Sequence, residues 1–268
     1  MKSNTSKAPQ AEADASLGPL QRAIAMLRTL AMGSRRGVPL TELAQQTGLP
    51  HSTVHRLLAQ MAEERLVEQH AESRRYLLGP LAFELGLAAE QHFDLRSRCR
   101  HLLESLARET EDTAYLIVRG GIDAVCLDRV EGLSPIRVVT LDIGSRRPLG
   151  LGAGGLAILA ALPDEERESL LADLKPKIEK QWLLPGHSLA RSVQQARDDG
   201  YALIRNRITA GTTAIGVCAK DSQGRPVAAL SVAAVNARMG AARIDRVHQL
   251  LIEATREIQS LLGGYKKA

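Results

Sequence analysis

The sequence predicts an α+β protein with an N-terminal winged helix-turn-helix and a C-terminal domain built on a roughly six-stranded antiparallel sheet. In the first part of the chain, apolar residues recur at spacings of three and four, which is typical of amphipathic helices. From residue 113 onward, short β-rich runs separated by Gly, Asp and Pro indicate strands. Residues 1–16 are polar and rich in Ala, and we expect a disordered tail there.

The composition is that of a soluble globular protein. The 268 residues are 44% hydrophobic and 24% charged, which is enough for two domains with their own cores. The net charge of +5 is compatible with a polyanionic partner but does not require one. Three cysteines without a CxxC pair favour a reducing cytoplasmic setting. No apolar run approaches membrane-spanning length, so we expect no membrane partner.

The N-terminal domain is expected over residues 17–79 and begins with a helix over residues 17–32. The apolar residues expected on the buried stripe of this helix are Leu20, Ile24, Leu27 and Leu30. A second helix follows, with Thr41 as its expected N-cap, and Gly48 allows the tight turn after it. Pro50 suits the first turn of the third helix. The core-facing residues of that helix are Val54, Leu57, Leu58 and Met61.

The opposite side of the third helix carries polar groups that can meet base edges and phosphates in the major groove. These residues are His51, Ser52, Thr53, His55 and Arg56. Two short strands, 66–69 and 75–78, predict a wing with Arg74 and Arg75 at its tip. Thr41 and Arg22 are also predicted to contact DNA, although a solvated helix face is a commoner role for a charge such as Arg22. The alternative is a helical hairpin without a nucleic-acid role.

A break at Gly79-Pro80 separates this domain from a linker helix over residues 80–93. Residues 94–262 are expected to form the C-terminal α+β domain, and residues 263–268 a flexible tail. Its helices are expected near 95–110, 153–162, 164–173, 188–199 and 240–262. Its strands are expected at 113–120, 123–130, 136–144, 201–205, 213–221 and 226–235. Residues 182–187 are expected to be irregular, with Ser188 as the cap of the following helix.

A Gly-rich loop at residues 150–155 matches GxGxxG, but nothing around it indicates the parallel βαβ unit that dinucleotide binding needs. We therefore expect no cofactor. Two interpretations stay open: the glycines permit close packing, or the loop presents N–H groups to a carboxylate. Arg205 and Arg207 are either carboxylate partners or solvated edge charges. No catalytic constellation is evident, and His51 with His55 lacks a third metal ligand.

Several segments together resemble the IclR family of bacterial transcriptional regulators over residues 17–262. They are LTELAQQTGLPHSTVHRLLAQM, RRYLLGPLAFELG, DAVCLDRVEG, RRPLGLGAGGLAILAALP and GRPVAALSVAA. The resemblance implies a winged helix-turn-helix, a linker helix and a GAF/PAS-like effector domain, in a homodimer or a dimer of dimers that binds promoter palindromes in double-stranded DNA. The effector-binding residues that it implies are Gly152, Ala153, Gly154, Ile204, Arg205, Ala214, Ser231 and Ala233.

The function expected from the sequence is a cytoplasmic, ligand-responsive transcriptional regulator. We expect a repressor that senses a small organic acid, because the Gly-rich loop suits a carboxylate. Two alternatives are kept: a constitutive DNA-binding regulator without an effector, and a small-molecule enzyme with a vestigial helix-turn-helix. The expected effector pocket is nearly devoid of acidic residues, which disfavours the enzyme.

Overall fold

The computed structural model describes residues 18–33, 36–90, 95–182 and 186–263. The chain forms two compact units, one through residue 93 and the other from residue 94. Each unit is described by itself. The tails predicted at 1–16 and beyond residue 263 lie outside the described residues, as do the last residues of the predicted linker helix, 91–93.

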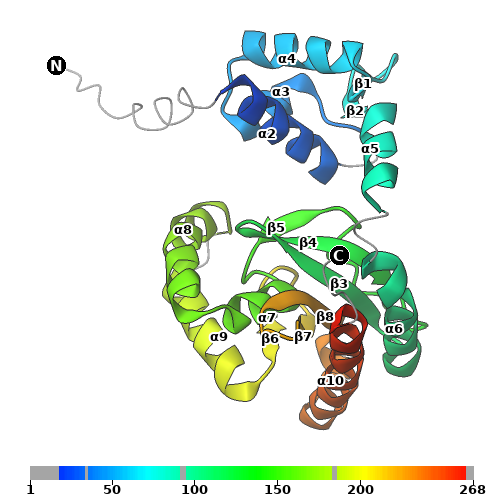
Figure 1. Cartoon of the computed structure of the whole chain (residues 1–268), viewed down its shortest axis with the longest axis vertical. Helices are drawn as coiled ribbons and strands as arrows, with labels where there is room; N and C mark the ends of the chain where they lie inside the picture. Colours follow the sequence, from blue (N-terminus) through cyan, green and yellow to red (C-terminus); the bar gives the residue numbers. More distant parts are fainter. Residues whose placement is uncertain (1–17, 34–35, 91–94, 183–185, 264–268) are drawn as a thin grey trace, which may run out of the picture. The chain divides into compact units, whose positions relative to one another are not determined.

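The first unit is a winged helix-turn-helix, as predicted (Figure 1). Its elements are α2 (Pro19–Met32), α3 (Leu40–Thr47), α4 (His51–Glu63), β1 (Val67–Gln69), β2 (Tyr76–Leu78) and α5 (Pro80–Glu90). The strands pair antiparallel, with Gln69 opposite Tyr76, and Val38 bridges to Tyr76 from the other side. The wing is thus extended by the chain that leads into α3.

The buried stripe of α2 differs from the prediction. Leu30 is buried and Leu27 partly buried, but Leu20 is 72% exposed and Ile24 is 38% exposed. Met26 is fully buried instead. Positions 20, 24 and 27 and positions 23, 26, 27 and 30 both fit helical spacing, so periodicity alone could not choose between the two stripes.

The start of α3 also differs from the prediction. Pro39 has an extended backbone and is the N-cap, and its carbonyl accepts hydrogen bonds from the amides of Glu42 and Leu43. Thr41 is therefore the second residue of the helix rather than its cap. Pro50 similarly precedes α4 as its N-cap. The predicted tight turn is confirmed, because Gly48 ends α3 with φ of 69°.

The second unit is a six-stranded antiparallel sheet between two layers of helices. Its order is β5-β4-β3-β8-β7-β6. The strands are β3 (Thr113–Gly120), β4 (Asp123–Val130), β5 (Arg146–Pro148), β6 (Ala202–Arg205), β7 (Thr212–Lys220) and β8 (Pro226–Val235), and the helices are α6 (Leu95–Thr110), α7 (Ala153–Ala161), α8 (Asp164–Trp182), α9 (Gly186–Asp199), the short η1 (Asn236–Arg238) and α10 (Ala241–Gly263). One core joins the sheet to α6 and α10, and the other joins it to α7, α8 and α9 (Figure 1).

Residues 136–144 form no strand, although their sequence pattern predicts one. The sixth strand is β5 instead. Side chains bind the backbone of the irregular segment: Tyr115 Oη donates to the Val138 carbonyl at 2.7 Å, and Arg129 Nη1 donates to the Leu141 carbonyl at 2.9 Å. Because these side chains satisfy backbone groups that a neighbouring strand would otherwise pair, the segment can follow an irregular path.

The connection between α8 and α9 is shorter than predicted. Helix α8 continues to Trp182, and α9 already begins at Gly186, so Ser188 lies inside α9 and is not its cap. Residues 183–185 lie outside the described residues. The predicted end of α9 is confirmed, since Gly200 follows it with φ of 76°.

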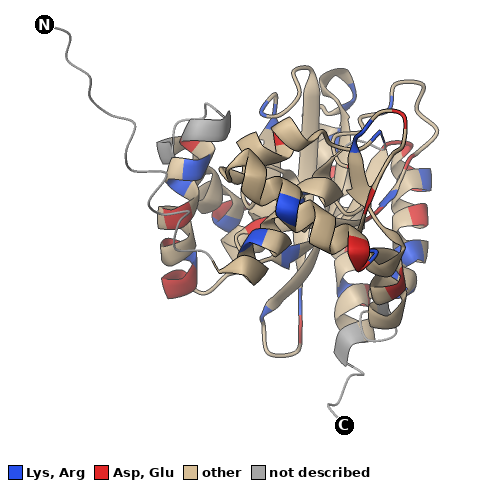
Figure 2. Ribbon diagram, turned by 90° about the horizontal axis from the view of Figure 1, so that it is seen from above, with Lys and Arg blue, Asp and Glu red and all other residues tan. Residues whose placement is uncertain are grey.

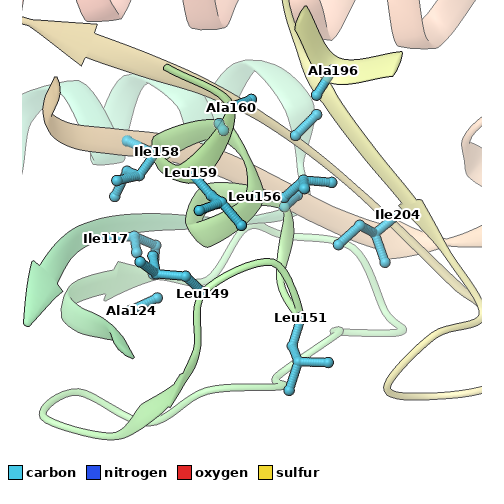
Figure 3. Packing of buried hydrophobic residues seen from close by; sticks show 14 of the residues in the cluster. Ile117, Ala124, Leu149, Leu151, Leu156, Ile158, Leu159, Ala160, Ala196 and Ile204 are labelled. Carbon is cyan, nitrogen blue, oxygen red and sulfur yellow. The ribbon is translucent and has the colours of Figure 1, made fainter. Parts of the chain in front are cut away.

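Helix α7 is buried on every side, and its apolar side chains project in different directions toward the sheet and α9 (Figure 3). Its glycines permit this close packing. A Cβ on Gly154 would lie 2.7 Å from Ile117 Cγ1, and one on Gly155 would lie 2.9 Å from Ala124 Cβ. From β7, a Cβ on Gly216 would lie 2.7 Å from the carbonyl carbon of Ala153. Packing therefore explains these glycines without a ligand.

Candidate functional site

Helix α4 has an apolar face and a polar face. Val54, Leu57, Leu58 and Met61 are buried in the core of the first unit. On the other side, His51, Ser52, His55 and Arg56 are exposed and Thr53 is half-buried. The polar side chains predicted to contact DNA therefore lie together on one accessible helix face. Such a face can enter a major groove.

The wing places its two arginines differently. Arg74 is exposed at the turn with φ of 56°, and its carbonyl accepts a hydrogen bond from Gln69 Nε2 at 3.0 Å. Arg75 is half-buried, and its Nη1 donates to the Gly37 carbonyl at 2.9 Å. Arg74 can thus reach a phosphate directly, whereas Arg75 also braces the wing against the loop before α3.

The two remaining residues predicted to contact DNA lie outside α4 and the wing. Arg22 is half-buried on α2, and Thr41 is exposed on α3. Figure 2 shows that blue and red segments occur together along the helices of the molecule, so the net positive charge is not confined to one element. The helices thus carry charges of both signs.

A pocket in the second unit lies between the start of α7, the sheet face that packs against α7 and the irregular segment 136–144. The empty space at this site, together with the open solvent at its mouth, amounts to about 580 Å³. It is lined by Tyr115, Ile117, Ala124, Val138, Thr140, Leu141, Arg147, Leu151, Gly152, Ala153, Gly154, Gly155, Ile204, Arg207, Ile208, Thr212, Ala214, Ser231 and Ala233. Most of these residues are apolar, as in many small-molecule sites.

The structure brings most of the predicted effector-binding residues to this pocket. Those that line it are Gly152, Ala153, Gly154, Ile204, Ala214, Ser231 and Ala233. Arg205 does not line it: its guanidinium donates to Thr213 Oγ1 at 3.4 Å and to the Met239 carbonyl at 3.2 Å. The reason is strand alternation, because Ile204 faces the pocket and its neighbour must face the other side of the sheet.

Sequence reasoning missed Arg147, which is only 8% exposed and lines the pocket from β5. Its Nη2 donates to the Thr140 carbonyl, and its Nε is buried without a hydrogen-bond partner. Burial lowers the pKa of Arg147 below its usual value. The only signal in the sequence was an Arg-Arg pair shortly before the Gly-rich loop, and such a pair is equally typical of surface charge.

Arg207 is the arginine of the predicted pair that lines the pocket. Asn206 has φ of 52°, so the chain leaves the regular path of β6 just before it. The Nη1 of Arg207 donates to the Gly150 carbonyl at 3.0 Å and its Nη2 to Ser192 Oγ at 2.6 Å. Burial lowers the pKa of Arg207 as well. Both partners are neutral, so the guanidinium charge is not balanced by them.

The N-terminus of α7 opens onto the same pocket. The amides of Ala153, Gly154 and Gly155 belong to the first turn and have no carbonyl partner inside the helix. A Cβ on Gly152 would lie 3.6 Å from Arg147 Cδ, so this arginine lies beside the helix start. Free amides, the positive end of a helix and a buried guanidinium together favour an anion.

Other kinds of site find no support in the part of the chain that the structure describes. No three His, Cys, Asp or Glu side chains gather there as a metal cluster. None of the described helices is both long and apolar enough to cross a membrane. Burial raises the pKa of both Cys126 and Cys218 to about 12, so neither thiol is activated as a nucleophile.

This chain combines a winged helix-turn-helix with an α+β domain that contains a pocket. That combination is typical of a class of DNA-binding transcriptional regulators. The family description "Bacterial transcriptional regulator IclR C-terminal" matches residues 87–260, and "IclR helix-turn-helix domain" matches residues 19–71. The chain is 30% identical to the transcriptional repressor IclR of Escherichia coli over 251 residues, 92% of this chain and 90% of that protein. This protein belongs to the IclR family of bacterial transcriptional regulators.

Solved structures share the fold. An IclR-type regulator from Silicibacter sp. TM1040 superposes with a TM-score of 0.78 at 22% identity, covering 92% of this chain and 97% of that one. An IclR homolog from Microbacterium hydrocarbonoxydans, solved in complex with 4-hydroxybenzoate, superposes with a TM-score of 0.71 at 23% identity, covering 92% of this chain and 100% of that one. The Escherichia coli and Silicibacter relatives are named as regulators and not as enzymes.

Proposed function

We propose that this protein is a ligand-responsive repressor that acts in the cytoplasm, binds promoter palindromes through α4 and the wing, and senses a small organic acid. The single observation that supports an acidic effector is the buried Nε of Arg147. This atom has no hydrogen-bond partner, and Arg147 lies beside the N-terminus of α7. An unpaired buried polar atom of a cation is costly unless a ligand satisfies it. The DNA-binding half rests on the exposed polar face of α4.

The protein is proposed to act as a homodimer or a dimer of dimers. Leu20 on α2 and Phe83 on α5 are 72% and 68% exposed, and side chains of this kind on the first unit suit burial against a second copy. Two copies would present two α4 helices to the two halves of a palindrome. Effector binding regulates DNA binding only if the ligand favours one arrangement of the oligomer energetically.

The test is selection of bound fragments from sheared genomic DNA of the source organism at near-physiological salt, with and without an extract of its small acidic metabolites. Salt must be controlled because phosphate contacts otherwise dominate the binding. We expect enrichment of a few palindromic promoter sites and a change in their occupancy with the extract. Uniform, salt-sensitive binding would contradict a specific regulator, and specific binding that ignores the extract would favour a constitutive one.

Substitution of Ser231 separates the two halves of this proposal. Ser231 is 6% exposed, and a Cβ on Gly154 would lie 3.5 Å from its Oγ. Ser231→Leu should fill the pocket and abolish the response to the extract while DNA affinity stays within about twofold of wild type. Leu133→Ser, on an 83% exposed side chain of the same unit, is the control and should respond normally. A fully responsive Ser231→Leu would show that the effector binds elsewhere.

A further inference from the structure

Two arginines line the pocket, one buried and one half-buried, and neither has an acidic neighbour among the described lining residues. These two, Arg147 and Arg207, are the charged residues of the described lining, and none of the others is Asp or Glu. Their hydrogen bonds go to the carbonyls of Thr140 and Gly150 and to Ser192 Oγ, all of which are neutral. The pocket therefore holds two formal positive charges that the described part of the chain leaves without a carboxylate partner.

This arrangement contrasts with the buried carboxylates of the same unit. Asp128 is 1% exposed and pairs with Arg100 Nη1 at 3.1 Å. Asp112 is 3% exposed and pairs with Arg238 Nε at 3.0 Å and Arg243 Nη2 at 2.9 Å. Where this unit buries these charges for its own fold, it joins anion to cation. The two pocket arginines depart from that rule, and a bound anion would restore it.

The two cations also stand at different places around the Gly-rich loop. Arg147 comes from β5 and lies beside Gly152 at the start of α7. Arg207 follows β6 and binds the carbonyl of Gly150 and Ser192 of α9. A ligand with one acidic group can satisfy the helix start and Arg147. A second acidic group is needed to neutralise Arg207 as well.

We propose that the effector is a dicarboxylate, with one carboxylate on Arg147 and the first amides of α7 and the other facing Arg207. This inference rests on the proposed effector function of the same pocket. Guanidinium groups bind carboxylates with charge-assisted, often bidentate hydrogen bonds. The wall of the pocket is made of apolar side chains such as Ile117, Leu151 and Ile204, which suits a carbon spine between two acids better than a compact phosphate.

The test is calorimetric titration of the purified full-length protein with matched probes at near-neutral pH. The dicarboxylates are the unbranched series from malonate to adipate and the three phthalate isomers. Each is compared with the monocarboxylate that lacks one acid group, and inorganic phosphate is titrated in parallel. We expect at least one dicarboxylate to bind about tenfold or more tightly than its monocarboxylate partner, because only the dicarboxylate neutralises both arginines.

Substitutions of the two arginines test which carboxylate of the ligand each arginine binds. Arg207→Gln should lower dicarboxylate affinity to that of the matched monocarboxylate and leave the monocarboxylate unchanged. Arg147→Gln should weaken both probes. Arg205→Gln is the matched control, because this neighbouring arginine points away from the pocket and binds Thr213 and Met239. Circular dichroism and DNA binding verify folding. If Arg147→Gln does not fold, the Arg207→Gln variant, at a half-buried position, still tests the second carboxylate.

Three results would overturn the dicarboxylate. They are equal affinity for mono- and dicarboxylates, binding of phosphate alone, and no binding of any dicarboxylate tested. Equal affinity in a pocket that loses binding on Arg147→Gln would leave the organic-acid effector standing and remove only the second acid group. Absence of any response to acidic metabolites in the genomic DNA selection would instead remove the effector function itself, so the two failures are distinguishable.

Discussion

Two helices of this protein begin in opposite surroundings, and the difference indicates what each unit can bind. Helix α4 buries one stripe and exposes His51, Ser52, His55 and Arg56 near its N-terminus. Helix α7 buries every residue from Ala153 to Ala160, and its N-terminus opens onto a pocket. An exposed polar face suits a polymer too large to enclose, whereas an enclosed helix start suits a small anion.

The arginines of the two units also differ in how far solvent reaches their charge. Arg56 is solvated on α4, so its charge costs little without a partner and can be matched by a phosphate or a base edge. Arg147 is only 8% exposed, so leaving its charge without a carboxylate partner is costly. A substitution of Arg56 therefore changes an exposed surface, whereas a substitution of Arg147 changes the packed interior of the second unit.

The largest effect is expected from Leu58→Ala, a substitution that tests whether the two units are stable independently. Leu58 is 1% exposed in the small core of the first unit. Leu58→Ala should destabilise that unit by about 2–5 kcal/mol through lost burial and a residual cavity. Hydrogen exchange should show loss of protection in α3 and α4 and unchanged protection in β3 and β8. Gln60→Ala, on the exposed side of the same helix, is the control, and joint loss in both units would disprove their independence.

A smaller effect tests the exposed face of α4 against DNA. Arg56→Ala should weaken binding to a selected promoter site by about 1–3 kcal/mol, with little change in folding stability because the side chain is exposed. Fluorescence anisotropy at several salt concentrations measures both the affinity and the salt slope. Arg65→Gln is the control, since Arg65 lies beyond the end of α4 and pairs with Glu84 at 3.2 Å. Unchanged affinity of Arg56→Ala would remove Arg56 from the interface.

The smallest effect concerns the start of α3. An N-cap Thr replaced by Ala typically costs about 1 kcal/mol. Because Pro39 is the N-cap here and Thr41 is exposed inside the helix, Thr41→Ala should change the free energy of unfolding by less than about 0.5 kcal/mol. Urea denaturation measures this difference. A loss near 1 kcal/mol would show that Thr41 caps α3 in solution.

Local sequence patterns were sufficient for most of the first unit because its helices and wing are formed by neighbours along the chain. The buried residues of α4 repeat at helical spacing, and Gly48 marks the turn that its positive φ requires. The same reasoning failed on α2, where two overlapping apolar stripes satisfy one period. Which stripe is buried depends on contacts with α3 and β2, and these are not encoded in the helix itself.

In the second unit, the sequence by itself placed five of the six strands and helix α7, and the family resemblance indicated seven of the residues around the pocket. Only the tertiary structure decided that residues 136–144 are irregular, that Arg207 and not Arg205 lines the pocket, and that Arg147 is buried. The physical reason is that the spacing of apolar residues along one helix or strand is a local property of the sequence. The burial of a side chain depends instead on residues that are far away along the chain. Tyr115 and Val138 illustrate this, since they are 23 residues apart and joined by one hydrogen bond.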